Sequence, residues 1–73
     1  MSAPQMWLAL TDSERSVTLQ AMLVYGGGFA SKLATAWGHA DANNTVKLGM
    51  AFPELVEKYG PGSGFYNAVL ERA

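Results

Sequence analysis

Hydrophobic residues recur along this chain at intervals of three and four, which is the spacing of one face of an α-helix. The clearest stripe consists of Phe29, Leu33, Ala36, Trp37 and Ala40. It predicts an amphipathic helix from Gly28 to about Ala40. Alternation with a period of two residues never persists for more than a few positions, so the pattern predicts no strand. The expected fold class is all-α.

A capping box marks the start of an earlier helix. The hydroxyl of Thr11 is placed to accept the amide of Glu14, whose carboxylate is placed to reach back to Thr11. A helix is therefore predicted from Asp12 to Tyr25, ending where Gly26 or Gly27 adopts a left-handed cap. Its apolar positions are Val17, Ala21 and Val24, with Met22 and Tyr25 beside them.

Three shorter helices follow, each after a residue that favours a helix start. They are predicted over residues 42–52, 53–59 and 64–72. Asp41 and Ser63 are side-chain N-caps, and Pro53 suits the first position of a helix. The whole chain, residues 1–73, is thus expected to be one helical domain, a compact bundle of four to five short helices.

The first ten residues are apolar but short. We expect residues 1–10 to form an N-terminal arm that lies across the domain or across a neighbouring chain. A strand is the alternative for this segment.

The amino-acid composition leads us to expect that another chain covers part of the surface. Hydrophobic residues make up 49% of the sequence and charged residues only 15%, which is too apolar for disorder and poor in charge for a small monomer. The chain has no cysteine, so no disulfide or zinc–thiolate site reinforces a core that must be thin at this length. We therefore expect the apolar surplus to be covered in a homo-oligomer or by an obligate partner.

The charges argue against nucleic acid and against a membrane. The net charge is −1 and the five basic residues are scattered, whereas nucleic-acid binders cluster theirs. A DNA-binding regulator, with the helices over 28–40 and 42–52 as a helix-turn-helix, is the remaining alternative of that kind. No run of 18 apolar residues and no secretion leader is present, so a cytoplasmic location is expected.

The glycine run between the first two long helices is the candidate ligand site. A helix start presents unpaired amides and partial positive charge, which together attract anions. The candidate residues are Tyr25, Gly26, Gly27, Gly28, Phe29 and Lys32. Such a site would take a nucleotide-like anion stacked between the two rings, most simply in an oligomer that acts as a sponge. The alternative is a tight helix corner without a ligand.

Aromatic residues supply candidates for a protein interface. Trp37 and Phe52 are expected in the core. Trp7, Tyr59 and Tyr66 are candidates for contact with another protein, since Trp and Tyr are enriched in binding hot spots, and the core is the alternative for them. His39 has no partner for a metal site or a catalytic pair. We therefore expect no enzyme, no cofactor and no metal.

Residues 25–63 resemble a group of uncharacterised small proteins encoded by bacteriophages and prophages. The shared pattern is GGF…LA.AW..AD..N…L..AFPEL..KYGPGS, and the first 24 residues fall outside it. The resemblance brings no catalytic motif. It implies a phage origin and an accessory role in the host bacterial cytoplasm, because such proteins often bind, inhibit or redirect a host protein, including components of antiviral defence. We expect this function here, with the anion sponge as the alternative.

Overall fold

The computed structural model describes residues 7–72. This part of the chain is helical and contains no strand, which confirms the all-α prediction. The helices are α2 (Asp12–Tyr25), α3 (Gly27–Gly38), α4 (Ala42–Ala51), α5 (Pro53–Tyr59) and α6 (Gly64–Arg72). Three of them have the predicted bounds, while α3 begins one residue earlier and ends two residues earlier than predicted, and α4 ends one residue earlier. Trp7 to Ala9 are also helical.

The predicted caps are present. The amide of Glu14 donates to the Thr11 hydroxyl (3.0 Å) and the amide of Thr11 donates to the Glu14 carboxylate (2.8 Å), which completes the capping box of α2. Asp41 accepts the amide of Asn44 (2.8 Å) at the start of α4. Ser63 accepts the amide of Tyr66 (3.1 Å) at the start of α6. Short-range chemistry therefore sets the starts of three helices.

Removal of the first cap should weaken the fold measurably. Thr11→Ala is expected to lower the free energy of unfolding by about 1 kcal/mol, because the amide of Glu14 loses its acceptor. The measurement is urea denaturation followed by circular dichroism. The control is Thr35→Ala on the exposed side of α3, where the hydroxyl only donates back to the Ser31 carbonyl (3.2 Å). Equal stability of the two variants would contradict a stabilising role for the cap.

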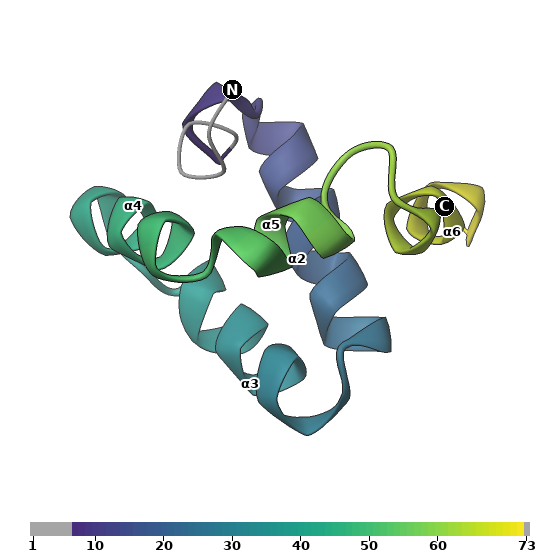
Figure 1. Ribbon diagram of the computed structural model, residues 1–73, viewed down its shortest axis with the longest axis horizontal. Helices are drawn as coiled ribbons and strands as arrows, with labels where there is room; N and C mark the ends of the chain where they lie inside the picture. Colours follow the sequence, from purple (N-terminus) through teal and green to yellow (C-terminus); the bar gives the residue numbers. More distant parts are fainter. Residues whose placement is uncertain (1–6, 73) are drawn as a thin grey trace.

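Helix α2 is the central element of the arrangement. Helices α3, α5 and α6 all pack against it, with α5 crossing in front of it in the view of Figure 1. Helix α4 contacts α3 and α5 and extends away from α2. The turn from α2 into α3 brings these two helices side by side along their length.

Two tryptophans fill the centre of the core. Trp7 and Trp37 are 1% and 2% exposed, and their ring centroids lie 4.6 Å apart at an interplanar angle of 44°. The indole N–H of Trp37 donates to the hydroxyl of Thr45 (3.0 Å), whereas that of Trp7 meets no acceptor among the described residues. The rest of the buried core is Thr18, Ala21, Met22, Ala30, Ala34, Val56, Tyr59 and Tyr66.

The end of the predicted N-terminal arm packs against the domain itself. Trp7 lies inside the core, and Arg15 fixes the backbone there by donating to the carbonyls of Trp7 (3.1 Å) and Leu8 (3.2 Å). The guanidinium of Arg15 also lies over the Trp7 ring, 5.4 Å from its centroid. The rest of the predicted arm, residues 1–6, lies outside the described residues.

The buried face of α3 differs from the predicted stripe. Ala30, Ala34 and Trp37 are buried, whereas Phe29 is 66% exposed. A small residue allows α3 to approach the two indoles and α2 closely, and a phenylalanine at that position would hold the helices apart. The stripe predicted for α2 shifts in the same way, because Thr18 and Met22 are buried while Val24 is exposed. In α6, Tyr66 is the buried residue.

Candidate functional site

The glycine run forms a sharp corner between α2 and α3. Gly26 is right-handed (φ −83°, ψ −5°) and its amide donates to the Met22 carbonyl (2.8 Å), so it closes α2. The predicted left-handed residue is Gly27, with φ +71°. A Cβ on Gly26 would overlap the Met22 carbonyl and the Ala30 side chain, and Gly27 needs a backbone conformation that other residues rarely adopt. The corner alone therefore explains two of the three glycines.

At the third glycine, no side chain covers the backbone at the start of α3. Gly28 is exposed and a Cβ there would meet no atom within 4 Å, so packing does not demand a glycine at this position. No side chain caps α3, and the exposed Lys32 lies one turn into the helix. The predicted glycines and Lys32 are thus on the same helix start.

The two rings beside the glycines do not face each other across them. Tyr25 packs on Phe65, with ring centroids 5.4 Å apart, and Phe29 packs on Phe52 at 5.8 Å. Each ring is therefore already in contact with another aromatic ring. The arrangement does not form the predicted aromatic pair around a bound base.

The three predicted interface aromatics lie in the core. Trp7, Tyr59 and Tyr66 are 1%, 3% and 8% exposed, so each offers little area to a partner. Phe65, which the sequence analysis did not select, is 36% exposed and packs against both Tyr25 and Tyr59. Phe65 and Tyr66 are neighbours in α6, and Tyr66 is the one that the fold buries.

Large apolar side chains gather around the glycine corner instead. We name this the corner surface, and it consists of Leu23, Val24, Tyr25, Phe29 and Phe65, all at least one-third exposed. Three of these are consecutive in the last turn of α2, so they spread over about 200° of the helix circumference. The last turn of α2 carries no basic residue, and the first turn of α3 carries no acidic residue. The corner surface is thus apolar, with Lys32 at its side.

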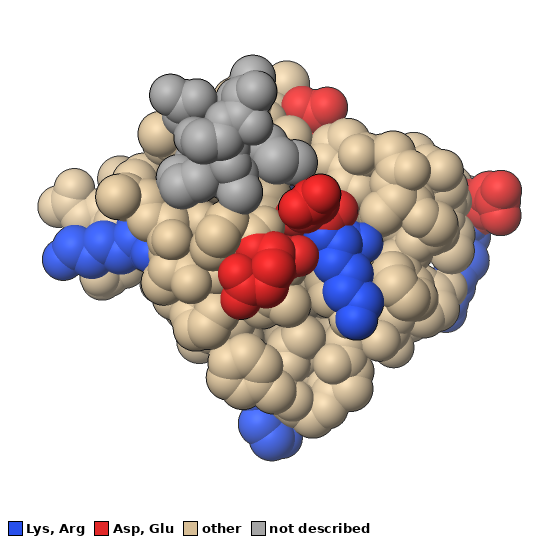
Figure 2. All heavy atoms as spheres, viewed as in Figure 1, with Lys and Arg blue, Asp and Glu red and all other residues tan. Residues whose placement is uncertain are grey.

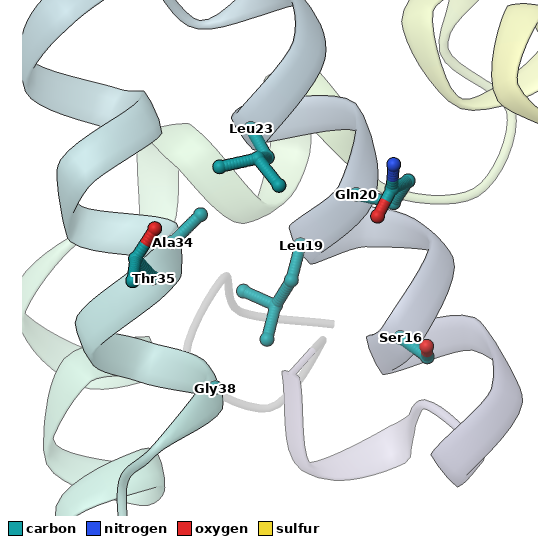
Figure 3. A pocket seen from close by; sticks show the side chains of 7 residues that line it. All are labelled: Ser16, Leu19, Gln20, Leu23, Ala34, Thr35 and Gly38. Carbon is teal, nitrogen blue, oxygen red and sulfur yellow. The ribbon is translucent and has the colours of Figure 1, made fainter.

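A shallow groove between α2 and α3 continues from this surface. Its volume is about 220 Å³, and Figure 3 shows Leu19 and Leu23 of α2 facing Ala34 and Thr35 of α3 across it. The remaining lining residues are Ser16, Gln20 and Gly38. No charged residue lines the groove, and the side chains on the α3 wall are small.

Charge is sparse on the surface. Figure 2 shows acidic and basic side chains in a few separate groups with broad uncharged areas between them. The structure thus shows no clustered basic patch on that face. Among residues 7–72, no group of three or more His, Asp or Glu side chains is placed to hold a metal ion, and His39 is exposed at the end of α3.

Comparisons with known proteins add no relative. No family model, no curated protein and no solved structure matches the chain significantly. Within residues 7–72, none of the helices has the length and apolar character needed to cross a bilayer.

Proposed function

We propose that this chain is a small non-enzymatic accessory protein of a bacteriophage that binds a host protein and inhibits or redirects it. The corner surface is the docking site. The observation that carries the proposal is the gathering of five exposed apolar side chains at one helix corner, with Phe29 exposed to 66%. Clustered apolar residues of this kind mark interaction sites on small proteins.

The apolar corner is not a sign of an incomplete fold. The accessible surface is 4346 Å². A folded monomer of 7.8 kDa exposes about 4,400 Å². The helices therefore close around their core as fully as expected, and the residues of the corner surface are exposed by the fold itself. Rigid helix ends also hold these side chains in place, which reduces the entropy lost on binding.

The phage setting has a separate basis. A phage origin, and a component of antiviral defence as the target, rest on the resemblance of residues 25–63 to small phage proteins. The glycine corner and Phe29 belong to this stretch, whereas the core residue Trp7 does not. The sequence resemblance thus supports the phage origin, and the apolar corner surface supports the binding of a host protein.

Site-specific photocrosslinking in bacterial cells tests the proposal. A photoreactive phenylalanine analogue at position 29 should capture a defined host protein, while the same analogue at position 50 should not. Met50 is a matched control because it is also a large exposed apolar residue, 59% exposed, on α4. With the captured protein purified, Phe29→Ser should weaken binding about tenfold or more and Met50→Ser should have little effect. Equal crosslinking at both positions, or none, would count against the corner surface.

Self-association is the other expected use of this surface. We infer that the chain also forms a homo-oligomer, because the corner surface and the adjoining α2–α3 groove present apolar area next to small residues. Light scattering gives the mass directly. An oligomer that Phe29→Ser dissociates and Met50→Ser leaves intact would place the contact at the corner, and a monomer at high concentration would overturn this inference.

The anion sponge is the second candidate. Its support is the bare start of α3, where Gly26 and Gly27 adopt right- and left-handed conformations in succession, a backbone pattern that favours anions. It ranks second because the rings of Tyr25 and Phe29 pack on other aromatic rings. Calorimetry with linear and cyclic nucleotides tests it, and Lys32→Gln should remove any heat that appears. Absence of heat for the whole panel would exclude it.

A further inference from the structure

A second hollow lies at the other end of α3, where the chain turns into α4. Its volume is about 470 Å³, and it is open to solvent, with most of its lining residues exposed. None of the residues that line it belongs to the corner surface. It is therefore a separate surface, and an inference about it does not depend on the proposed host partner.

Small side chains leave this hollow unfilled. Ala36 and Ala40 line it from the end of α3 and the following residues, and Ala51 lines it from the end of α4. Helix α4 runs back after the turn at residues 39–41, so that Phe52 at its end packs on Phe29 at the start of α3 with ring centroids 5.8 Å apart. Alanines have no atoms beyond Cβ to fill the space between the two helices. Leu48 adds an apolar wall. The inner lining is therefore apolar.

Nitrogen donors complete the lining. Lys47 contributes an ammonium group, Asn44 an amide and His39 an imidazole, and no carboxylate is among the lining residues. The neighbouring Asp41 is engaged as the cap of α4, since its carboxylate accepts the amide of Asn44 (2.8 Å). An apolar hollow with a cation and an amide among its lining is complementary to a ligand with an apolar body and an anionic head.

We propose that this hollow binds a small organic carboxylate with an apolar body. The hydrocarbon or aromatic body lies against the alanines and Leu48, and the carboxylate accepts hydrogen bonds from Lys47 and Asn44. Lys47, Leu48 and Ala51 share one stripe of α4 with Asn44, at the helical spacing of three and four residues. The apolar and polar contacts to one ligand thus come from a single helix face, with the end of α3 opposite.

Nuclear magnetic resonance of the full chain tests this proposal with a defined probe. The probe is 4-phenylbutyrate, compared with its neutral amide and with acetate as the isolated head group. We expect amide shifts that saturate in the millimolar range for residues at the end of α3 and along α4. The neutral amide and acetate should each bind at least about tenfold more weakly, because each lacks one half of the ligand.

Three variants locate the binding. Lys47→Gln keeps the helix propensity and removes the charge, so it should weaken the probe about tenfold. Lys58→Gln, which changes an exposed lysine on α5 outside the hollow, should leave the affinity unchanged. Ala51→Leu adds a side chain into the hollow and should abolish the shifts, with native tryptophan fluorescence confirming that the chain is folded.

Several outcomes would overturn the proposal. The first is that the probe causes no saturable amide shifts. The second is that the shifts at Lys58 and Lys47 are similar in size. The third is that the Lys47→Gln variant binds the probe as well as the parent chain. Equal affinity for the carboxylate and its amide would also reject the charged contact. A failed search for a host partner at the corner surface would leave this result unaffected.

Discussion

Replacing Trp7 with alanine is expected to remove a large part of the stability of the fold at 25 °C. The indole is 1% exposed, packs on Trp37 at 4.6 Å and lies beneath the Arg15 guanidinium. Truncation of a buried tryptophan to alanine removes about 3–5 kcal/mol of stability. A domain of this length holds only about 4–11 kcal/mol in total. The loss is therefore comparable to the whole stability of the fold.

The fluorescence of the remaining tryptophan reports the outcome. In Trp7→Ala, the emission of Trp37 should shift to the red as its ring meets water, and the urea transition should move to a much lower midpoint. Leu8→Ala is the matched control, since Leu8 is adjacent in sequence but 52% exposed, and its midpoint should stay close to that of the parent chain. A Trp7→Ala chain with an unchanged midpoint would show that Trp7 is not part of the core.

Gly49→Val should produce the second largest loss, about 3 kcal/mol. Gly49 is buried in α4, and a Cβ at this position would lie 2.8 Å from Cγ and 2.9 Å from Cβ and Cδ1 of Trp7. The ring cannot retreat, because Trp37 and Arg15 pack against it. Valine adds three carbons to a site that does not accommodate one, which is overpacking at the upper end of its usual range.

Gly38→Val separates this clash from the general effect of valine in a helix. Gly38 is the last residue of α3, and a Cβ there would have no atom within 4 Å. Its free energy of unfolding should change little, and Gly49→Ala should fall between the two. Calorimetric midpoints rank the three variants. If Gly38→Val were as destabilising as Gly49→Val, contact with Trp7 would not be the cause.

The helix starts could be predicted because the information is local. Thr11, Asp41 and Ser63 each cap an amide three residues ahead, so four residues of sequence contain both partners of the bond. The left-handed glycine was predicted for the same reason, since one backbone conformation at Gly27 decides it. Such features depend on no other part of the fold.

The choice of buried face could not be predicted in the same way. Periodicity selects the largest apolar residues, and Phe29 therefore ranked above Ala30. In the structure, Ala30 is buried because the helices approach most closely there, and Phe29 is exposed. For Trp7, Tyr59 and Tyr66, the sequence left core and interface open for a related reason. The sequence gives the size of an aromatic ring but does not show which distant segment covers it.

The same contrast between local sequence information and tertiary packing applies to the candidate sites. The glycine corner is contiguous in sequence, from Tyr25 to Lys32, and its place at a helix start was predictable. The corner surface also needs Phe65 from α6, and the α3–α4 hollow depends on the angle between two helices. Both follow from tertiary packing, which a short-range pattern does not contain.

The position of Trp7 affects when the protein can fold during synthesis. Its indole contacts Gly49 and Trp37, so this side chain leaves the ribosome before the partners that bury it have been made. Contacts between residues so far apart in sequence delay folding, and the nascent chain carries an unprotected tryptophan until then. We therefore expect the early peptide to depend on chaperones or on rapid translation, and ribosome profiling combined with limited proteolysis of stalled chains would reveal protection only after α4 has emerged.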